Sequence, residues 1–93
     1  MEAYTIIREP HPAGESITFL LNGRFSEDAL PELEQSIAEA RGARQHIVID
    51  LSEVTLMDRR TVQYFSEQAV DDIKLINCPV YLLRWITQVS NGN

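Results

Sequence analysis

The first part of the chain alternates between apolar and polar positions at the period of β-strands. Residues 4–8 and 16–21 are predicted strands, and the second places Ile17, Phe19 and Leu21 on one face. Turn-forming residues fill 9–14 between them, so an antiparallel pair is expected. Asn22-Gly23 is expected to end the second strand.

After the second predicted strand, the apolar residues recur at the period of an α-helix. Residues 26–41 carry an apolar stripe made of Leu30, Leu33, Ile37 and Ala40. Proline is tolerated only in the first turn of a helix, so Pro31 makes Asp28 a better N-cap than Ser26. Gly42 is the predicted stop at the other end.

The middle of the chain predicts a buried strand followed by a second helix. Residues 46–51 contain three consecutive β-branched side chains, which is typical of a parallel strand buried on both faces. A helix is expected over 59–69, with Asp58 as its N-cap. Its inner stripe is Val62, Phe65 and Ala69.

The last part predicts one more strand and one more helix. Asp71-Asp72 close the preceding helix, and residues 73–77 form the strand. Pro79 suits the first position of a helix that runs to about Gln88. The β-β-α-β-α-β-α order predicts a small α/β fold, with helices packed on a mixed four-stranded sheet and right-handed crossovers between parallel strands.

Composition narrows the classes of function. Ninety-three residues predict a single domain over 1–93. The net charge of -6 argues against nucleic acid and anionic membranes as partners. No apolar run approaches the roughly 20 residues of a membrane span, so no membrane insertion is expected. The start of the chain lacks the pattern of a signal peptide, and Cys78 is the only cysteine, so a reduced, cytoplasmic setting is expected.

The run Asp58-Arg59-Arg60-Thr61 is electrostatically unusual. It lies where a predicted strand leads into a predicted helix. The first turn of a helix carries partial positive charge, so exposed cations there cost about 0.3–1 kcal/mol each. Arg59 and Arg60 are interpreted either as contacts for an acidic partner or an anion, or as two solvated surface arginines.

Few other residues are candidates for metal binding, phosphate binding or catalysis. His11, His46 and Cys78 lack the spacing of metal ligands, and there is no glycine-rich phosphate loop. Neither a metal nor a cofactor is expected, and the protein is not expected to be an enzyme. A nucleophilic pair of Cys78 and His46 stays open, although a small buried apolar role for Cys78 is favoured.

Residues 47–62 resemble the STAS family, which includes anti-sigma-factor antagonists and domains of sulfate transporters. The family pattern is an apolar strand, Asp-Leu-Ser, and then apolar-Asp-Ser-Ser-Gly opening a helix. The matching positions here are Asp50, Leu51, Ser52, Val54, Met57 and Asp58. Residues 21–23 and 75–77 also resemble the family's turn before the first helix and its last core strand.

The chain departs from that pattern at the residues that matter for mechanism. The resemblance implies a serine, phosphorylated by a partner kinase, directly after the second Asp, and this position is Arg59. Arg60 occupies the second hydroxyl position and Thr61 the glycine position. Arginine accepts no phosphoryl group, so the usual serine switch is expected to be absent.

The resemblance implies a non-enzymatic regulatory module that binds a protein, such as an anti-sigma factor or a related kinase-like protein. The implied surface contains Ser52, Thr55, Asp58, Arg59, Arg60 and Thr61. The hydroxyl groups of this set are alternative phosphorylation sites or turn and capping groups. Two other functions stay open: an accessory STAS subunit of a membrane transport system, and a small-molecule or nucleotide-binding module.

The predicted last helix is apolar over more than one stripe. Tyr81 and Trp85 lie between these stripes, and both residue types are common anchors at interfaces. The apolar side chains that do not pack on the sheet are interpreted either as part of the core or as a surface for a partner or a homodimer.

Overall fold

The computed structural model describes residues 4–68, 73–82 and 84. Its elements are β1 (Tyr4–Pro10), β2 (Ser16–Phe25), α1 (Leu30–Gly42), β3 (His46–Met57), α2 (Arg59–Gln68) and β4 (Ile73–Ile76). A further helical turn begins at Val80, so the predicted order of elements is confirmed. Most of the last predicted helix, including Trp85, lies outside the described residues, as do Ala69, Asp71 and Asp72.

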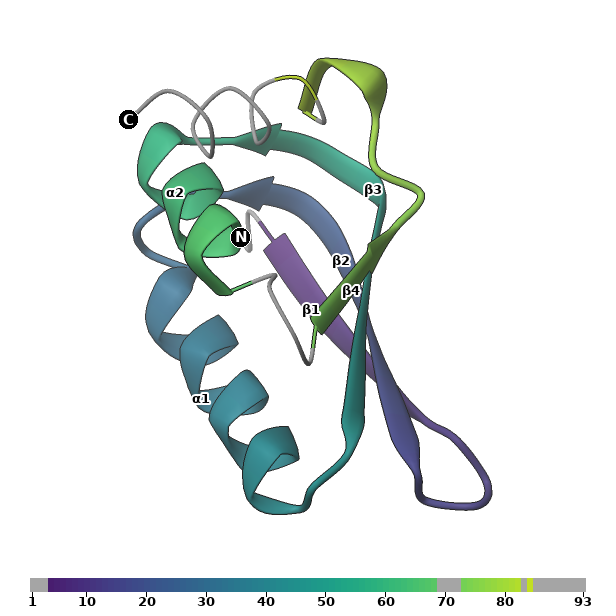
Figure 1. Ribbon diagram of the computed structural model, residues 1–93. Helices are drawn as coiled ribbons and strands as arrows, with labels where there is room; N and C mark the ends of the chain where they lie inside the picture. Colours follow the sequence, from purple (N-terminus) through teal and green to yellow (C-terminus); the bar gives the residue numbers. More distant parts are fainter. Residues whose placement is uncertain (1–3, 69–72, 83, 85–93) are drawn as a thin grey trace.

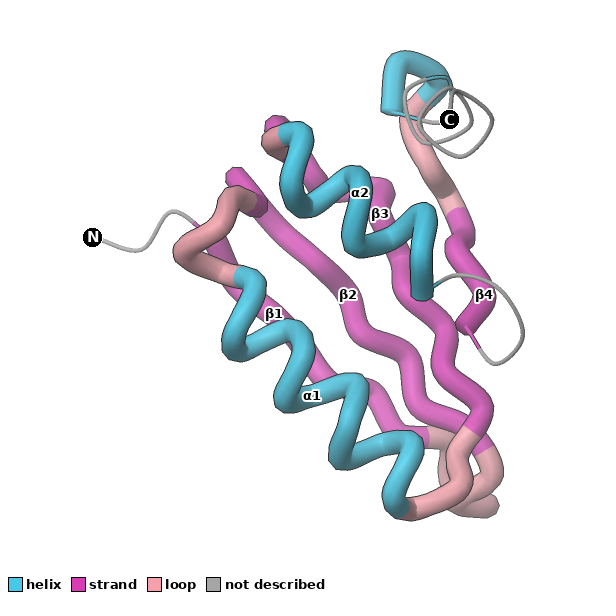
Figure 2. The backbone as a smooth tube through the Cα atoms, turned by 60° about the vertical axis from the view of Figure 1, so that its left-hand side comes forward, coloured by secondary structure: helices cyan, strands magenta, loops and turns pink. Residues whose placement is uncertain are grey.

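The strands form one mixed sheet in the order β1-β2-β3-β4. β1 pairs antiparallel with β2 from Tyr4↔Gly23 to Pro10↔Ile17, while β3 is parallel to both β2 and β4. The predicted mixed four-stranded sheet is therefore confirmed. The crossovers β2-α1-β3 and β3-α2-β4 advance in one direction, and right-handed crossovers of that kind place both helices on the same face. Figure 2 shows α1 and α2 side by side on that face.

The core lies between this face of the sheet and the two helices. The sheet contributes Phe19, Leu21, Phe25, Ile47, Ile49, Leu51 and Met57, all fully buried. The predicted stripes of both helices are confirmed at Leu33, Ile37 and Ala40 of α1 and at Val62 and Phe65 of α2.

The expectation that residues 46–51 are buried on both faces is wrong. Ile47, Ile49 and Leu51 are buried, but Val48 and Asp50 between them are only partly buried. The reason is the placement of α1 and α2 on a single face, which leaves the alternate side chains of β3 without a helix from this pair above them.

The two central strands are longer than predicted. β2 continues through Asn22-Gly23 to Phe25, and β3 continues to Met57. Gly23 has a φ of 100°, and the register with β3 shifts on either side of it. Glycine adopts positive φ without strain, so it forms an irregularity inside the strand instead of ending it.

The prediction of Asp28 as the N-cap of α1 is wrong. The cap is Ala29, with no side-chain hydrogen bond, and backbone turns at Ser26 and Glu27 lead into the helix. Gly42 is the last helical residue, but the left-handed residue that reverses the chain is Arg44, with a φ of 57°.

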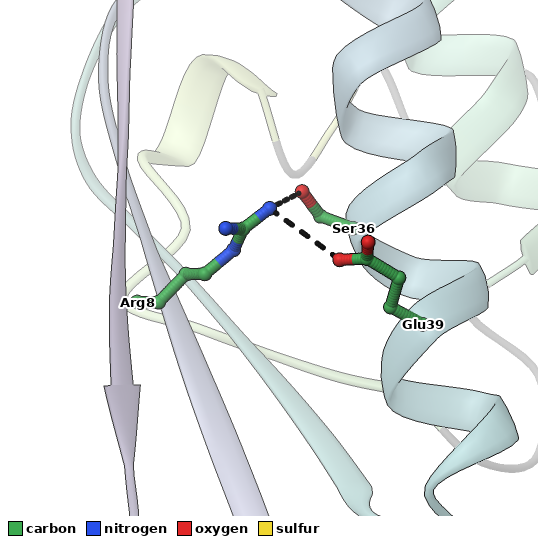
Figure 3. Close-up of polar contacts among 3 residues, drawn as sticks. All are labelled: Arg8, Ser36 and Glu39. Carbon is green, nitrogen blue, oxygen red and sulfur yellow. Dashed lines mark hydrogen bonds and ion pairs between the residues drawn. The ribbon is translucent and has the colours of Figure 1, made fainter.

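Polar contacts tie α1 to the edge strand β1. The Arg8 guanidinium donates to Ser36 Oγ at 2.8 Å and lies 3.7 Å from Glu39 Oε1 (Figure 3). The Tyr4 hydroxyl donates to Glu32 Oε1 at 2.9 Å. Arg8 gives the buried Ser36 hydroxyl a hydrogen-bond partner, which removes the cost of burying that group alone. These contacts fix one side of α1, so its other side faces α2.

Candidate functional site

The candidate site lies where β2 and β3 end. Phe25 and Met57 are paired as the last residues of these parallel strands, and both side chains are fully buried. The chain leaves β2 toward α1 and leaves β3 directly into α2 (Figure 1). The carboxyl ends of parallel strands are where α/β folds commonly place binding groups.

Asp58 connects these two chain exits. Its Oδ1 accepts the backbone N–H of Thr61 at 2.9 Å, which confirms the predicted N-cap of α2. Its Oδ2 accepts the backbone N–H of Glu27 at 3.0 Å, and its own N–H donates to the Phe25 carbonyl at 3.0 Å. One side chain therefore holds the start of α2 against the β2–α1 loop.

The environment of Asp58 favours its ionised form. Burial by itself would raise the pKa of this carboxyl, but hydrogen bonds from Thr61 and Glu27 and the positive charge of Arg60 outweigh it. The pKa of Asp58 is therefore below its ordinary value of 3.8, and the residue is a carboxylate at neutral pH.

Arg59 and Arg60 form the exposed first turn of α2, which contains no acidic residue. Within the described part of the chain, neither arginine forms an ion pair. The Asp58 carboxylate offsets part of the unfavourable interaction of these cations with the helix end. Their guanidinium groups remain available for other contacts.

The hydroxyl residues of the predicted surface do not gather around these arginines. Ser52 and Thr55 are exposed but lie within β3, not in a loop. Ser52 is six positions before Asp58, roughly 20 Å along an extended strand. Its backbone N–H donates to Asp50 Oδ1 at 2.9 Å, and Asn77 Nδ2 donates to Oδ2 of the same carboxylate at 3.2 Å. Thr61 is fully buried, so it supports the N-cap and is not presented to a partner.

Two solved structures have a similar overall fold. A STAS domain from Rhodobacter sphaeroides, described as an antisigma-factor antagonist, superposes with a TM-score of 0.63 at 15% identity, covering 81% of this chain and 87% of that domain. The chain has a STAS-like fold. An uncharacterized protein from Shewanella loihica with a SpoIIAA-like fold superposes with a TM-score of 0.58 at 14% identity, covering 99% of this chain and 80% of that one. No protein-family model and no curated protein matches the sequence.

The STAS-like fold confirms the sequence resemblance at the level of architecture. Identities near 15% establish the fold and no more. No helix in the described part of the chain is long and apolar enough to cross a membrane. Among the same residues, no group of three or more His, Cys, Asp or Glu side chains is placed to hold a metal ion.

The start of the last helical turn carries both buried and exposed apolar residues. Leu82 is fully buried, whereas Val80 is 71% exposed and Tyr81 50% exposed. Tyr81 is thus accessible, as its predicted interface role requires.

A groove that was not predicted from the sequence lies between α1 and α2. Its volume is about 340 Å³. Its lining comes from both helices and consists of Leu30, Glu34, Arg60, Gln63, Tyr64 and Glu67. The α2 members recur at intervals of three and four residues, a helical stripe beside the apolar one, but only tertiary structure brings this stripe next to Glu34.

The pairing of Cys78 with His46, which the sequence leaves open, does not occur. His46 begins β3, while Cys78 follows the end of β4, which is parallel to β3. β4 therefore separates the two residues along the sheet, because His46 lies before the first residue paired with β4 and Cys78 lies beyond the last residue of β4. Burial raises the pKa of the Cys78 thiol above its ordinary value of 9.0, which leaves it mostly protonated at neutral pH.

We expect Cys78 to react slowly with thiol reagents. The thiolate is the reactive form; the raised pKa reduces its population, and partial burial limits access to it. Labelling by iodoacetamide at neutral pH, followed by mass spectrometry, should be at least about tenfold slower than for the urea-unfolded chain. Equal rates in the folded and unfolded protein would contradict this.

Proposed function

We propose that this protein is a non-enzymatic, cytoplasmic protein-interaction module with a regulatory role similar to that of anti-sigma-factor antagonists. The STAS-like fold supports it, because one structure with this fold is described as an antisigma-factor antagonist. The proposed surface is the start of α2 together with the β2–α1 loop that Asp58 holds against it.

The observation that carries the proposal is the exposed arginine pair on a fixed helix end. Arg59 and Arg60 destabilise α2 where they stand, yet the backbone beneath them is held by hydrogen bonds from two separate segments. An unfavourable charge on a well-ordered element is more easily understood as a binding feature than as a structural one. Arginine forms bidentate contacts with carboxylates, so the complementary partner surface is acidic.

The same geometry supports a binding surface without the usual serine switch. Position 59 is an arginine, and Thr61, two positions later, is buried. Ser52 and Thr55 are exposed, but they lie within β3, six and three positions before Asp58. The positive charge of this surface is therefore fixed, where the resemblance implies a charge that phosphorylation changes.

The arginine pair is tested by a binding comparison. We expect R59Q/R60Q to weaken partner binding about tenfold or more at low salt and to flatten its salt dependence, since two charge contacts are lost. The protein serves as bait in a lysate of its source organism, and bound proteins are identified and then measured in purified form by titration. Their identity also separates an anti-sigma or kinase-like partner from a transporter subunit.

A matched control keeps the change in net charge constant. R44N/K74S also removes two cations, but Arg44 lies in the α1–β3 connection and Lys74 lies on β4. Figure 1 shows that this connection and the start of α2 are at opposite ends of β3. Asparagine suits the left-handed backbone at position 44. R59Q/R60Q should fold at least as stably as the parent, because it removes cations from a helix N-terminus. Unchanged binding by R59Q/R60Q at low salt would refute the proposal.

A further inference from the structure

The groove between α1 and α2 has an uneven charge. We call the space lined by Leu30, Glu34, Arg60, Gln63, Tyr64 and Glu67 the interhelical groove. Glu34 and Glu67 are exposed, and neither forms an ion pair within the described part of the chain. Among the described residues that line the groove, Arg60 is the only cation, and it lies seven positions before Glu67, roughly 10 Å along the helix. The lining away from Arg60 is therefore acidic, although Arg41 of α1, which is not among the described lining residues, adds positive charge near Tyr64.

An aromatic and an aliphatic side chain complete this acidic part. Tyr64 and Leu30 are both half-buried against the core, so each presents part of its surface to the groove. Burial raises the pKa of the Tyr64 hydroxyl and the nearby charge of Glu34 raises it further, while the positive charge of Arg41 on α1 opposes them. Glu34 and Tyr64 both line the groove, which brings a carboxylate of α1 to the same space as the aromatic residue of α2.

We propose that the interhelical groove binds a basic side chain, arginine or lysine, presented by a protein partner. The charged head lies between the Glu34 and Glu67 carboxylates and next to the Tyr64 ring, which attracts cations. The aliphatic stem of the same side chain covers Leu30. Gln63 contributes an amide group at the edge of the groove.

This binding mode deepens the proposed function and rests on it only for the statement that the partner is a protein. Arg59 and Arg60 bind an acidic group at the start of α2, and the groove binds a basic group about two turns further along α2. A partner with these opposite charges at that separation docks in one orientation, because the reversed orientation places like charges together.

The groove is tested without the partner, using small peptides as probes. The N-acetylated, C-amidated tripeptide Ala-Arg-Ala is titrated into the full chain at low ionic strength, and backbone amide shifts are followed by NMR. Its citrulline analogue has the same shape without the charge. We expect the arginine peptide to bind weakly, with shifts confined to the groove residues, and the citrulline peptide to bind at least about threefold more weakly.

Two variants with opposite expected effects sharpen the test. E34Q/E67Q should weaken binding of the arginine peptide about fivefold, whereas R60Q should strengthen it, because a competing cation is removed. E9Q/E53Q changes the net charge equally but alters carboxylates on β1 and β3, so it should bind like the parent. Both glutamates of the groove are exposed on helix surfaces, so their replacement should leave the fold intact.

Equal affinity for the arginine and citrulline peptides, or unchanged binding by E34Q/E67Q, would overturn the inference. R60Q also separates this inference from the proposed function. It should strengthen binding of the basic peptide and weaken binding of the protein partner through the arginine pair. If the arginine peptide does not bind but R59Q/R60Q still loses the protein partner, the inference about the groove is refuted and the proposed function stands.

Discussion

Replacing Phe25 with alanine is expected to lower the free energy of unfolding by about 3–5 kcal/mol, the range for truncating a buried phenylalanine. Phe25 is 1% exposed and its ring lies 5.2 Å from that of Tyr4. It is the last residue of β2, paired with the equally buried Met57. The cavity would therefore open directly beneath the start of α2. Urea unfolding followed by circular dichroism measures the change.

The size of this effect relative to the whole domain makes it informative. A domain of this size typically has about 5–15 kcal/mol of stability in total, so F25A would populate unfolded chains visibly in mild urea. Leu56, beside Met57 on β3, provides the control, because it is 48% exposed and L56A should change stability by less than about 0.5 kcal/mol. A loss below about 1 kcal/mol for F25A would show that the end of β2 is not packed as described.

The sequence predicts the buried faces of the helices better than it predicts the ends of the strands. Helical stripes such as Leu33, Ile37 and Ala40 are local patterns, and they predict the buried face of a helix directly. The end of a strand is not local, because it depends on whether a neighbouring strand continues beside it. Asn22-Gly23 has the composition of a turn, yet both residues pair with β1 and β3, and pairing with β3 carries β2 on to Phe25.

In the candidate site, too, contacts between residues close in sequence are predictable and contacts between distant residues are not. The N-cap at Asp58 is predictable because it concerns residues three positions apart. Its second contact, with the Glu27 N–H, joins residues that are 31 positions apart and has no sequence signal. The interhelical groove is likewise formed by α1 and α2 together, although each of its residues has an ordinary place on its own helix.

Asp58→Ala is expected to lower the free energy of unfolding at neutral pH by about 2–3 kcal/mol. The loss of an N-cap costs typically about 1 kcal/mol, and the loss of a charge-assisted hydrogen bond costs about 1.5–3 kcal/mol before solvent reduces it. D58N should lose less, because its side-chain carbonyl still accepts the Thr61 N–H while its NH₂ group cannot accept from Glu27. The control is D28A, which alters an exposed carboxylate that caps no helix.

The loss of stability on replacing Asp58 should depend on pH, and the pKa of Asp58 fixes the direction of that dependence. D58N is the variant to compare with the parent, because it removes the charge and keeps the shape of the side chain. The folded-state pKa of Asp58 lies below the ordinary value of 3.8, so the charge-dependent stabilisation is complete above that value and is lost as the pH falls through the folded-state pKa. The gap between parent and D58N should be constant from about pH 7 to about pH 5 and should narrow in more acidic solution. Asp50, whose pKa is lowered by Ser52 and Asn77 against the opposing effect of burial, adds acid sensitivity to both proteins alike. The narrowing gap, measured by urea unfolding at each pH, therefore isolates Asp58. A gap of equal size on both sides of the carboxyl pKa would show that the capping contact, and not the charge, accounts for its role at the start of α2.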